Sequence, residues 1–310
     1  MRKIRTALSV LLILLLLCTS VGCAPQEQQA IYMVTDGQEG YYWENMILGA
    51  KAAVYDAGWE IQIVPWEDEP DMKAHINAAR EIGAGYIVTA FSDERSRANE
   101  MMFLDADAPQ LIVLGKDTGE TWAATRMVFD ESQTGTGQQL AKHIGMQSDL
   151  LLVVDKEHYN YWDQWEVPMR RTLGNHGSRV LERLYCAGEE DTAYRLCMQA
   201  LATYGDSIDG IVCSGQMGTH GALRAVKESG LNIPIIGAEF DEVIAQGLSE
   251  GIIRASLVHM TYGCGYMGIE KAVHLENDRE IESWAAMAAI YVDAENMFDE
   301  NLLPFLYSIE

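Results

Sequence analysis

Short apolar segments alternate with helix-forming segments along almost the whole chain, and this alternation constrains the fold more than any other feature of the sequence. A strand that is buried on both faces of a parallel sheet appears as a continuous apolar run of about four to six residues. A covering helix instead repeats its apolar residues every three to four positions. The pattern therefore predicts an α/β protein with parallel sheets that carry helices on both faces.

The alternation runs through two successive series. The first series contains predicted strands at 31–34, 61–66, 86–91, 110–114 and 127–129 and predicted helices at 43–57, 70–82, 92–104 and 135–146. The second contains predicted strands at 150–154, 180–185, 210–213, 234–237 and 255–258 and predicted helices at 164–173, 192–204, 218–228 and 241–248. Two series of this size favour two doubly wound lobes, although the number of units alone also fits a single βα barrel.

Residues 1–22 have the features of an export signal. Arg2, Lys3 and Arg5 supply positive charge ahead of an apolar segment at 7–18. This segment is too short to span a bilayer core of about 30 Å as a permanent helix, so we expect it to act as a signal peptide that is removed. Beyond it, the sequence contains no apolar run that approaches the length of a membrane span.

The signal ends at a cysteine that we expect to carry a lipid anchor. Cys23 follows Ser20-Val21-Gly22, and these residues resemble the lipobox of bacterial lipoproteins, although such boxes usually carry Leu where Ser20 stands. Lipidation of Cys23 makes residues 23–29 a linker and anchors the protein to the outer face of the bacterial cell membrane. Cleavage as an ordinary secreted protein is the alternative.

The charge of the chain excludes several classes of partner. Its 310 residues include 46 acidic and 22 basic side chains, which give a formal net charge of −24 at pH 7. Nucleic-acid binding draws most of its affinity from Lys and Arg that neutralise phosphates, so DNA or RNA is not the expected partner. Membrane contact is expected through the lipid anchor alone. Hydrophobic residues make up 48% of the chain, which is enough for a substantial core.

Cysteine and histidine spacings give no support for a metal centre, a cofactor or a catalytic site. No C-x-x-C, H-x-x-x-H or H-E-x-x-H motif occurs, and no P-loop is present. Residues 247–251 match G-x-S-x-G, but they follow a predicted helix and not a strand, so they do not form a nucleophile elbow. Residues 263–268 match G-x-G-x-x-G, but they lie near the end of the chain and not in a first βαβ unit. We therefore expect a protein that is not an enzyme and has no cofactor. The cysteines at 186, 197, 213 and 264 are expected to be free thiols, with a disulfide between Cys186 and Cys197 as the alternative.

A family resemblance covers residues 30 to 293 and rests on segments that follow one another in order. They lie at 42–45, 83–88, 109–114, 129–137, 209–213, 221–225, 233–237 and 262–268. In these segments the chain resembles the type I periplasmic binding proteins, which share the fold of ribose-binding protein and of the effector domain of the lactose repressor. No helix-turn-helix precedes the first strand, so the resemblance implies an extracytoplasmic receptor and not a repressor.

The resemblance also implies a division of the chain. It predicts two doubly wound parallel-sheet lobes joined by a three-strand hinge, with crossovers near Glu131, His259 and Trp284. Lobe one is expected to comprise 30–131 plus 260–284, and lobe two 132–259 plus 285–310. The glycines of the G-x-G-x-x-G match then lie at a hinge crossover, where they allow close helix packing.

Aromatic and polar residues after the strands are the candidate ligand contacts. Tyr42 and Trp43 correspond to aromatic residues that stack on the sugar in sugar receptors of this fold. Most polar anchors of those receptors are replaced here, which leaves the ligand's identity open. By correspondence, the expected ligand-binding residues are Tyr42, Trp43, Ser92, Lys116, Asp163, Trp165, Gln216, Glu239 and His259.

The expected function is that of a lipid-anchored substrate-binding protein. It captures a small polar ligand, a sugar or a sugar-like molecule, between its lobes and delivers it to the permease of an ABC importer, acting as a monomer. The alternative is a sensory receptor of the same fold that presents its closed state to a membrane histidine kinase or a chemoreceptor. The sequence does not separate these two, because both use the same closed-lobe surface.

Overall fold

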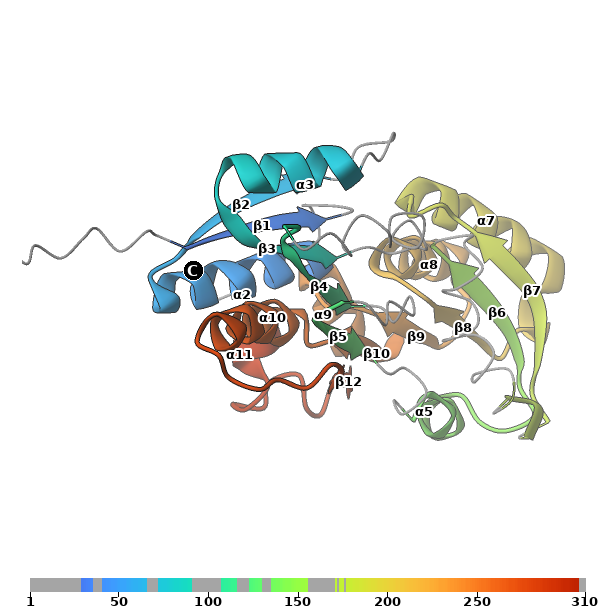
Figure 1. Cartoon of the computed structure of the whole chain (residues 1–310). Helices are drawn as coiled ribbons and strands as arrows, with labels where there is room; N and C mark the ends of the chain where they lie inside the picture. Colours follow the sequence, from blue (N-terminus) through green and yellow to red (C-terminus); the bar gives the residue numbers. More distant parts are fainter. Residues whose placement is uncertain are drawn as a thin grey trace, which may run out of the picture.

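The computed structural model describes most of the chain after the predicted signal and linker. The described residues are 29–35, 41–65, 72–90, 107–115, 123–129, 135–155, 171, 173–175 and 177–306. They form two six-stranded sheets, each with helices on both faces (Figure 1). Within these ranges, no helix combines the length and the apolar character that a membrane crossing requires.

The first sheet contains six strands, each parallel to its neighbours. In sheet order they are β11 (Ala285–Met287), β5 (Thr125–Phe129), β4 (Gln110–Gly115), β3 (Ala84–Ala90), β1 (Ala30–Thr35) and β2 (Glu60–Pro65). The chain places β2 on one side of β1 and then adds β3, β4 and β5 on the other side, so the sheet is doubly wound.

Helices cover both faces of this sheet, and the alternation of side chains along β1 shows how. Ile31 packs in one cluster with α2 (Tyr41–Ala57) and α10 (Thr261–Glu276). Tyr32, whose side chain points to the opposite face, packs in another cluster with α3 (Met72–Glu81). Burial on both faces explains why β1 is apolar at nearly every position.

The second sheet repeats this architecture. In sheet order its strands are β12 (Ala289–Val292), β10 (Ile253–His259), β9 (Ile235–Ala238), β8 (Gly210–Cys213), β6 (Asp149–Val154) and β7 (Arg179–Tyr185). Only β12 is antiparallel to its neighbour within the described sheet. The helical segments are α5 (Thr136–His143), α7 (Glu190–Tyr204), the short 3₁₀ helix η3 (Gly205–Ser207), α8 (Gln216–Ser229), α9 (Glu242–Ser249) and α11 (Leu303–Leu306). Leu151 faces the cluster that contains α7, α8 and α9, whereas Leu152 faces the one that contains α5.

The two parallel-sheet lobes confirm the predicted fold class and exclude the single barrel. Helix α2 begins at Tyr41, two residues earlier than predicted, because the Tyr41 side chain is buried and its carbonyl oxygen accepts a hydrogen bond of 3.0 Å from Asn45 Nδ2. The helix predicted at 92–104 and almost all of the helix predicted at 164–173 lie outside the described residues.

The chain returns from the first sheet to the second later than the sequence predicted. Residues 285–310 were assigned to lobe two, but Ala285–Met287 pair in parallel with β5 in the first sheet. The crossing therefore lies at Ala288, whose carbonyl oxygen accepts a hydrogen bond of 3.1 Å from the Met260 amide of another crossover. The error has a simple cause, since residues 285–292 form one apolar run across both strands and give no sign of the change of sheet.

Candidate functional site

The carboxyl ends of β5 in the first sheet and of β10 in the second meet in the region where α2 begins. In open α/β sheets this edge is where ligands bind. The ring of Phe129, the last residue of β5, lies 4.9 Å from the ring of His259, the last residue of β10. The Tyr42 ring of α2 lies 6.0 Å from the same His259 ring. Residues from both lobes therefore form one cluster.

Glu239 is the most constrained residue of this cluster. It follows β9 with a left-handed backbone (φ +64°), which is unfavourable for a residue with a side chain. Its amide donates a hydrogen bond of 2.7 Å to the Leu257 carbonyl oxygen, and its own carbonyl oxygen accepts one of 2.5 Å from Ser256 Oγ. Both partners lie on β10, so the neighbouring strand holds the Glu239 backbone in place.

The Glu239 side chain pairs with His259 through only one of its oxygens. Glu239 Oε1 lies 2.6 Å from His259 Nδ1, and the two residues are 7% and 6% exposed. Glu239 Oε2 is also buried but has no hydrogen-bond partner among the described residues. A buried carboxylate oxygen in this state can accept a further hydrogen bond from a bound molecule.

Aromatic rings of lobe one surround the pair from the other side. Tyr42 makes edge-to-face contacts with Trp43 at 4.9 Å and with Phe129 at 6.2 Å between ring centroids. Tyr41 belongs to α2 of lobe one, yet it packs in the main hydrophobic cluster of lobe two. Burial, and secondarily the charge of Glu239, raise the pKa of the Tyr41 hydroxyl, which therefore stays protonated.

Asp155 lies at the same edge, directly after β6, and interacts with the start of α8. A Cβ atom built on Gly215 or on Gly218 would lie 2.1 or 2.4 Å from the Asp155 carboxylate oxygens, so only glycine admits this carboxylate so close to the helix N-terminus. The thiol of Cys186 donates a hydrogen bond of 3.3 Å to Asp155 Oδ1. The helix N-terminus stabilises a negative charge at this position.

The thiols at 186, 197, 213 and 264 are all buried and free, as expected, and the alternative disulfide between Cys186 and Cys197 is absent. Burial, and then the neighbouring Asp155 carboxylate, raise the pKa of Cys186 to about 12.

Gln216 belongs to a separate polar network. Its Nε2 donates a hydrogen bond of 2.6 Å to Asp241 Oδ2, and His220 Nε2 lies 2.7 Å from the same oxygen. Asp241 also caps α9, because its Oδ1 accepts a hydrogen bond of 2.8 Å from the Ile244 amide. Burial alone would raise the pKa of Asp241, but the hydrogen bonds from His220, Ile244 and Gln216 outweigh it and lower the pKa below its usual value.

The structure brings together four of the residues selected from the sequence: Tyr42, Trp43, Glu239 and His259. Gln216 is engaged by Asp241 and not by this cluster. The other selected residues lie outside the described part of the chain; these are Ser92, Lys116, Asp163, Trp165 and the anchor candidate Cys23.

Sequence reasoning missed several residues at the strand ends. They are Thr35, Tyr41, Phe129, Asp155 and Thr261. Most of them end a strand or follow one directly, so the rule that ligands bind at the carboxyl ends of strands would have found them if it had been applied to every strand. Tyr41 gave no such signal, because its burial in the other lobe depends on tertiary packing.

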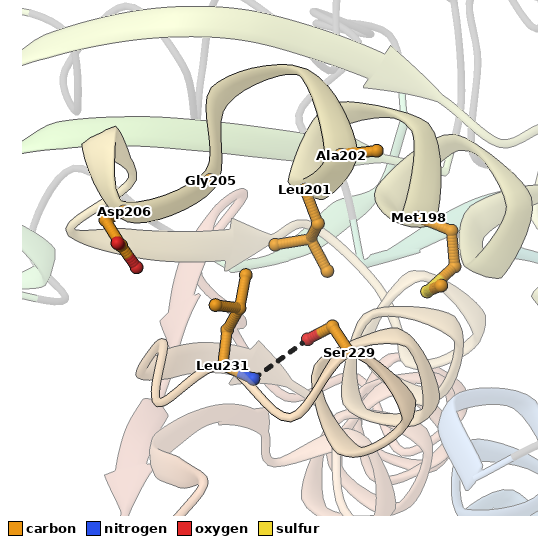
Figure 2. A pocket seen from close by; sticks show the side chains of 7 residues that line it. All are labelled: Met198, Leu201, Ala202, Gly205, Asp206, Ser229 and Leu231. Atoms are coloured by element: carbon orange, nitrogen blue, oxygen red, sulfur yellow. Dashed lines mark hydrogen bonds between the residues drawn. The ribbon is translucent and has the colours of Figure 1, made fainter.

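A hollow elsewhere in lobe two has a different character (Figure 2). Its volume is about 330 Å³, and it lies between the carboxyl ends of α7 and α8, at the edge of the sheet opposite the strand ends. Its lining comprises Met198, Leu201, Ala202, Gly205, Asp206, Ser229 and Leu231. Across the described residues, no group of three or more His, Cys, Asp or Glu side chains could hold a metal ion.

Comparison with known families agrees with this two-lobe geometry. Residues 31–280 match the profile of the periplasmic binding protein domain. The chain belongs to the periplasmic binding protein family. Members of this family are extracytoplasmic binding proteins and not enzymes. Membership therefore confirms both the predicted family and the prediction that the protein is a binding protein and not an enzyme. No curated protein sequence matches the chain significantly.

Solved structures of solute-binding proteins and of a sugar transporter have the same fold. A carbohydrate transporter solute-binding protein from Agrobacterium radiobacter, in complex with D-arabinose, is 19% identical, with a TM-score of 0.78 over 91% of this chain and 99% of that one. An ABC transporter solute-binding protein from Agrobacterium vitis, bound to α-D-tagatopyranose, is 17% identical, with a TM-score of 0.79 over 91% and 100% of the two chains. A sugar transporter from Clostridium phytofermentans is 18% identical, with a TM-score of 0.73 over 86% and 99%.

Proposed function

We propose that this periplasmic binding protein captures a small polar ligand, a sugar or a sugar-like molecule, between its two lobes and delivers it to an ABC importer. Family membership supports the binding role, and the arabinose and tagatose complexes of solved relatives support the ligand class. Tyr42, Trp43, Glu239 and His259 are the described residues that we assign to the ligand. Ser92, Lys116, Asp163 and Trp165 complete the proposed set.

Buried polar atoms without partners at the strand ends carry this proposal. Among the described residues, Thr35 Oγ1, Glu239 Oε2 and Thr261 Oγ1 are buried and have no hydrogen-bond partner. They belong to the last residue of β1, the residue after β9 and the first residue of α10. Leaving such an atom unpaired costs about 1–3 kcal/mol, so a ligand whose hydroxyls both donate and accept would stabilise this region.

A ligand screen followed by titration calorimetry tests the proposal. Pentoses, hexoses and polyols are screened by thermal shift on the mature protein, and we expect saturable binding of one molecule per chain. Glu239→Ala should weaken this binding at least about tenfold, the equivalent of about 1.4 kcal/mol. Asp206→Ala removes a carboxylate at the remote hollow of Figure 2 and should leave the affinity unchanged. The proposal fails if no compound in the screen binds saturably.

Cellular uptake separates transport from sensing. If the protein serves an importer, deletion of its gene should abolish uptake of the radiolabelled ligand. If uptake persists while the transcriptional or chemotactic response to the ligand is lost, the protein is the alternative receptor for a histidine kinase or a chemoreceptor.

We further assign a lipid anchor to Cys23, at the end of the signal formed by residues 1–22. The support is the charged start, the apolar segment and the lipobox-like residues that precede this cysteine. Cys23→Ala should release the protein from the membrane fraction and remove palmitate labelling. A variant that still partitions into detergent and incorporates palmitate would show that the anchor lies elsewhere.

A further inference from the structure

Among the described residues, three carboxylates lie at the strand-end edge of the second sheet, and the protein itself compensates two of them. Asp155 lies against the N-terminus of α8 and accepts a hydrogen bond from the Cys186 thiol. Asp241 accepts hydrogen bonds from Gln216 and from the Ile244 amide and pairs with His220. Each of these charges therefore has several partners within the protein.

The third carboxylate, Glu239, is not compensated in this way. His259 occupies Oε1, while Oε2 is buried and has no partner among the described residues. Among these residues no Lys or Arg forms an ion pair with Glu239. A buried anion with a single partner is unfavourable unless a cation or a further donor joins it.

The backbone at Glu239 indicates that the carboxylate itself is needed. Its left-handed conformation suits Gly or Asn better than Glu, and two hydrogen bonds to β10 fix it. Strain that surrounding structure maintains is a recognised feature of ligand sites. An acidic side chain at a position that favours glycine is therefore best explained by what its free oxygen binds.

Aromatic rings beside Glu239 favour one kind of donor. The ring centroids of Tyr42, Phe129 and His259 are separated from one another by 4.9 to 6.2 Å. Glu239 contacts the His259 ring. Aromatic faces attract cations, and aromatic rings combined with a carboxylate match the chemistry of an organic ammonium ion.

Extending the proposed function, on which this step rests, we infer that the ligand carries a protonated amine, as an amino sugar does, and that Glu239 Oε2 binds the ammonium group. A hydroxyl could donate a hydrogen bond to this oxygen, but it would leave His259 as the only group that can balance the charge of the carboxylate. An ammonium group supplies the hydrogen bond and the opposite charge together. An N-acetyl group retains a donor and removes the charge, which makes it the informative comparison.

Matched compounds test this inference by titration calorimetry at neutral pH. The amines are D-glucosamine, D-galactosamine, D-glucamine and ethanolamine, and each is paired with its hydroxyl and its N-acetyl counterpart. We expect at least one amine to bind saturably and at least about tenfold more tightly than both of its counterparts.

Variants of Glu239 locate the effect. Glu239→Gln keeps the shape and removes the charge, so it should abolish the preference for the amine, whereas Glu239→Asp should retain the preference at lower affinity. Glu242→Gln removes the same charge from an exposed position of α9 and controls for diffuse attraction of cations by an acidic protein. It should change neither the affinity nor the preference. A melting curve for each variant shows that it is folded.

Two outcomes overturn the inference and are distinct. If neutral sugars bind as tightly as their amines, or if Glu239→Gln keeps the preference, the ligand is not recognised as an ammonium ion, but the proposed binding function stands. If no compound, charged or neutral, binds saturably, both the inference and the proposed function fail.

Discussion

Gly49 of α2 and Gly265 of α10 mark the point where these two helices cross in direct backbone contact. A Cβ atom on Gly49 would lie 2.0 Å from the Tyr262 carbonyl oxygen, and a Cβ atom on Gly265 would lie 2.0 Å from the Met46 carbonyl oxygen. Because α2 also carries Tyr41 and Tyr42 at its first turn, this crossing fixes the helix whose start contributes to the candidate site.

The first prediction concerns this crossing. Gly265→Ala should destabilise the protein by at least about 1–3 kcal/mol, the usual cost of overpacking, because the obstacle is backbone that cannot rotate away. Gly263→Ala is the matched control in the same helix, since its nearest neighbour is a methionine methyl group at 3.8 Å. That variant should be neutral or stabilised by up to about 1 kcal/mol through better helix propensity. Urea unfolding measures both.

Equal stability of the two alanine variants would contradict this account. It would mean that α2 and α10 can move apart without loss of other contacts.

The residue pattern predicted much of the fold but less of the candidate site. Apolar runs revealed the central strands because these are buried on two faces. The late G-x-G-x-x-G match was correctly interpreted as a place of close helix packing, since Gly265 lies against the backbone of α2. In contrast, Tyr41 was missed because it belongs to one lobe and is buried in the other. Gln216 was assigned to the ligand by correspondence with the family, and its hydrogen bond to Asp241 could not be predicted because it depends on how two loops meet, which linear spacing does not encode.

The second prediction concerns Trp43. Trp43→Ala should weaken binding of the sugar found in the screen at least about tenfold, since stacking on an aromatic ring contributes about 0.5–1.5 kcal/mol beyond the buried area. Trp59→Ala is the control, because Trp59 stacks on Tyr86 at 6.1 Å and precedes β2, at the opposite end of the strands. It should leave the affinity unchanged. If both variants bind like the parent in calorimetry, the sugar does not contact α2.

The third prediction concerns pH and Asp241. Its pKa in the folded protein is below the usual 3.8, because its hydrogen bonds outweigh the effect of burial. A carboxyl group whose pKa is lowered by folding stabilises the folded state at pH values above its unfolded-state pKa. This stabilisation disappears as the pH falls through its folded-state pKa. Asp241→Asn should therefore lower the free energy of unfolding by about 1–3 kcal/mol at neutral pH. The difference from the parent should shrink as the solution is acidified below about pH 4.

Chemical unfolding at neutral and acidic pH measures this difference. Asp191→Asn is the control, because Asp191 pairs with Arg224 at 2.9 Å but its side chain is 91% exposed. Exposed ion pairs contribute about 0–1 kcal/mol, so this variant should differ little from the parent at either pH. A difference for Asp241→Asn that does not vary with pH would show that the carboxylate acts through shape and not through charge.

The last prediction concerns the contact that Tyr41 makes between the lobes. Tyr41 extends from α2 of lobe one into the main hydrophobic cluster of lobe two, and its side chain is 9% exposed. The Tyr41 ring is buried only while the two lobes are in contact, so its apolar area stabilises that state. Tyr41→Ala removes this contribution and should shift the population toward more separated lobes. X-ray scattering of the ligand-free variant should give a larger radius of gyration than the parent, while Tyr41→Phe, which keeps the ring, should match it. Saturating ligand should then reduce the radius of the alanine variant more than that of the parent, because its starting population is more open. Identical scattering from all three proteins would show that Tyr41 does not hold the lobes together.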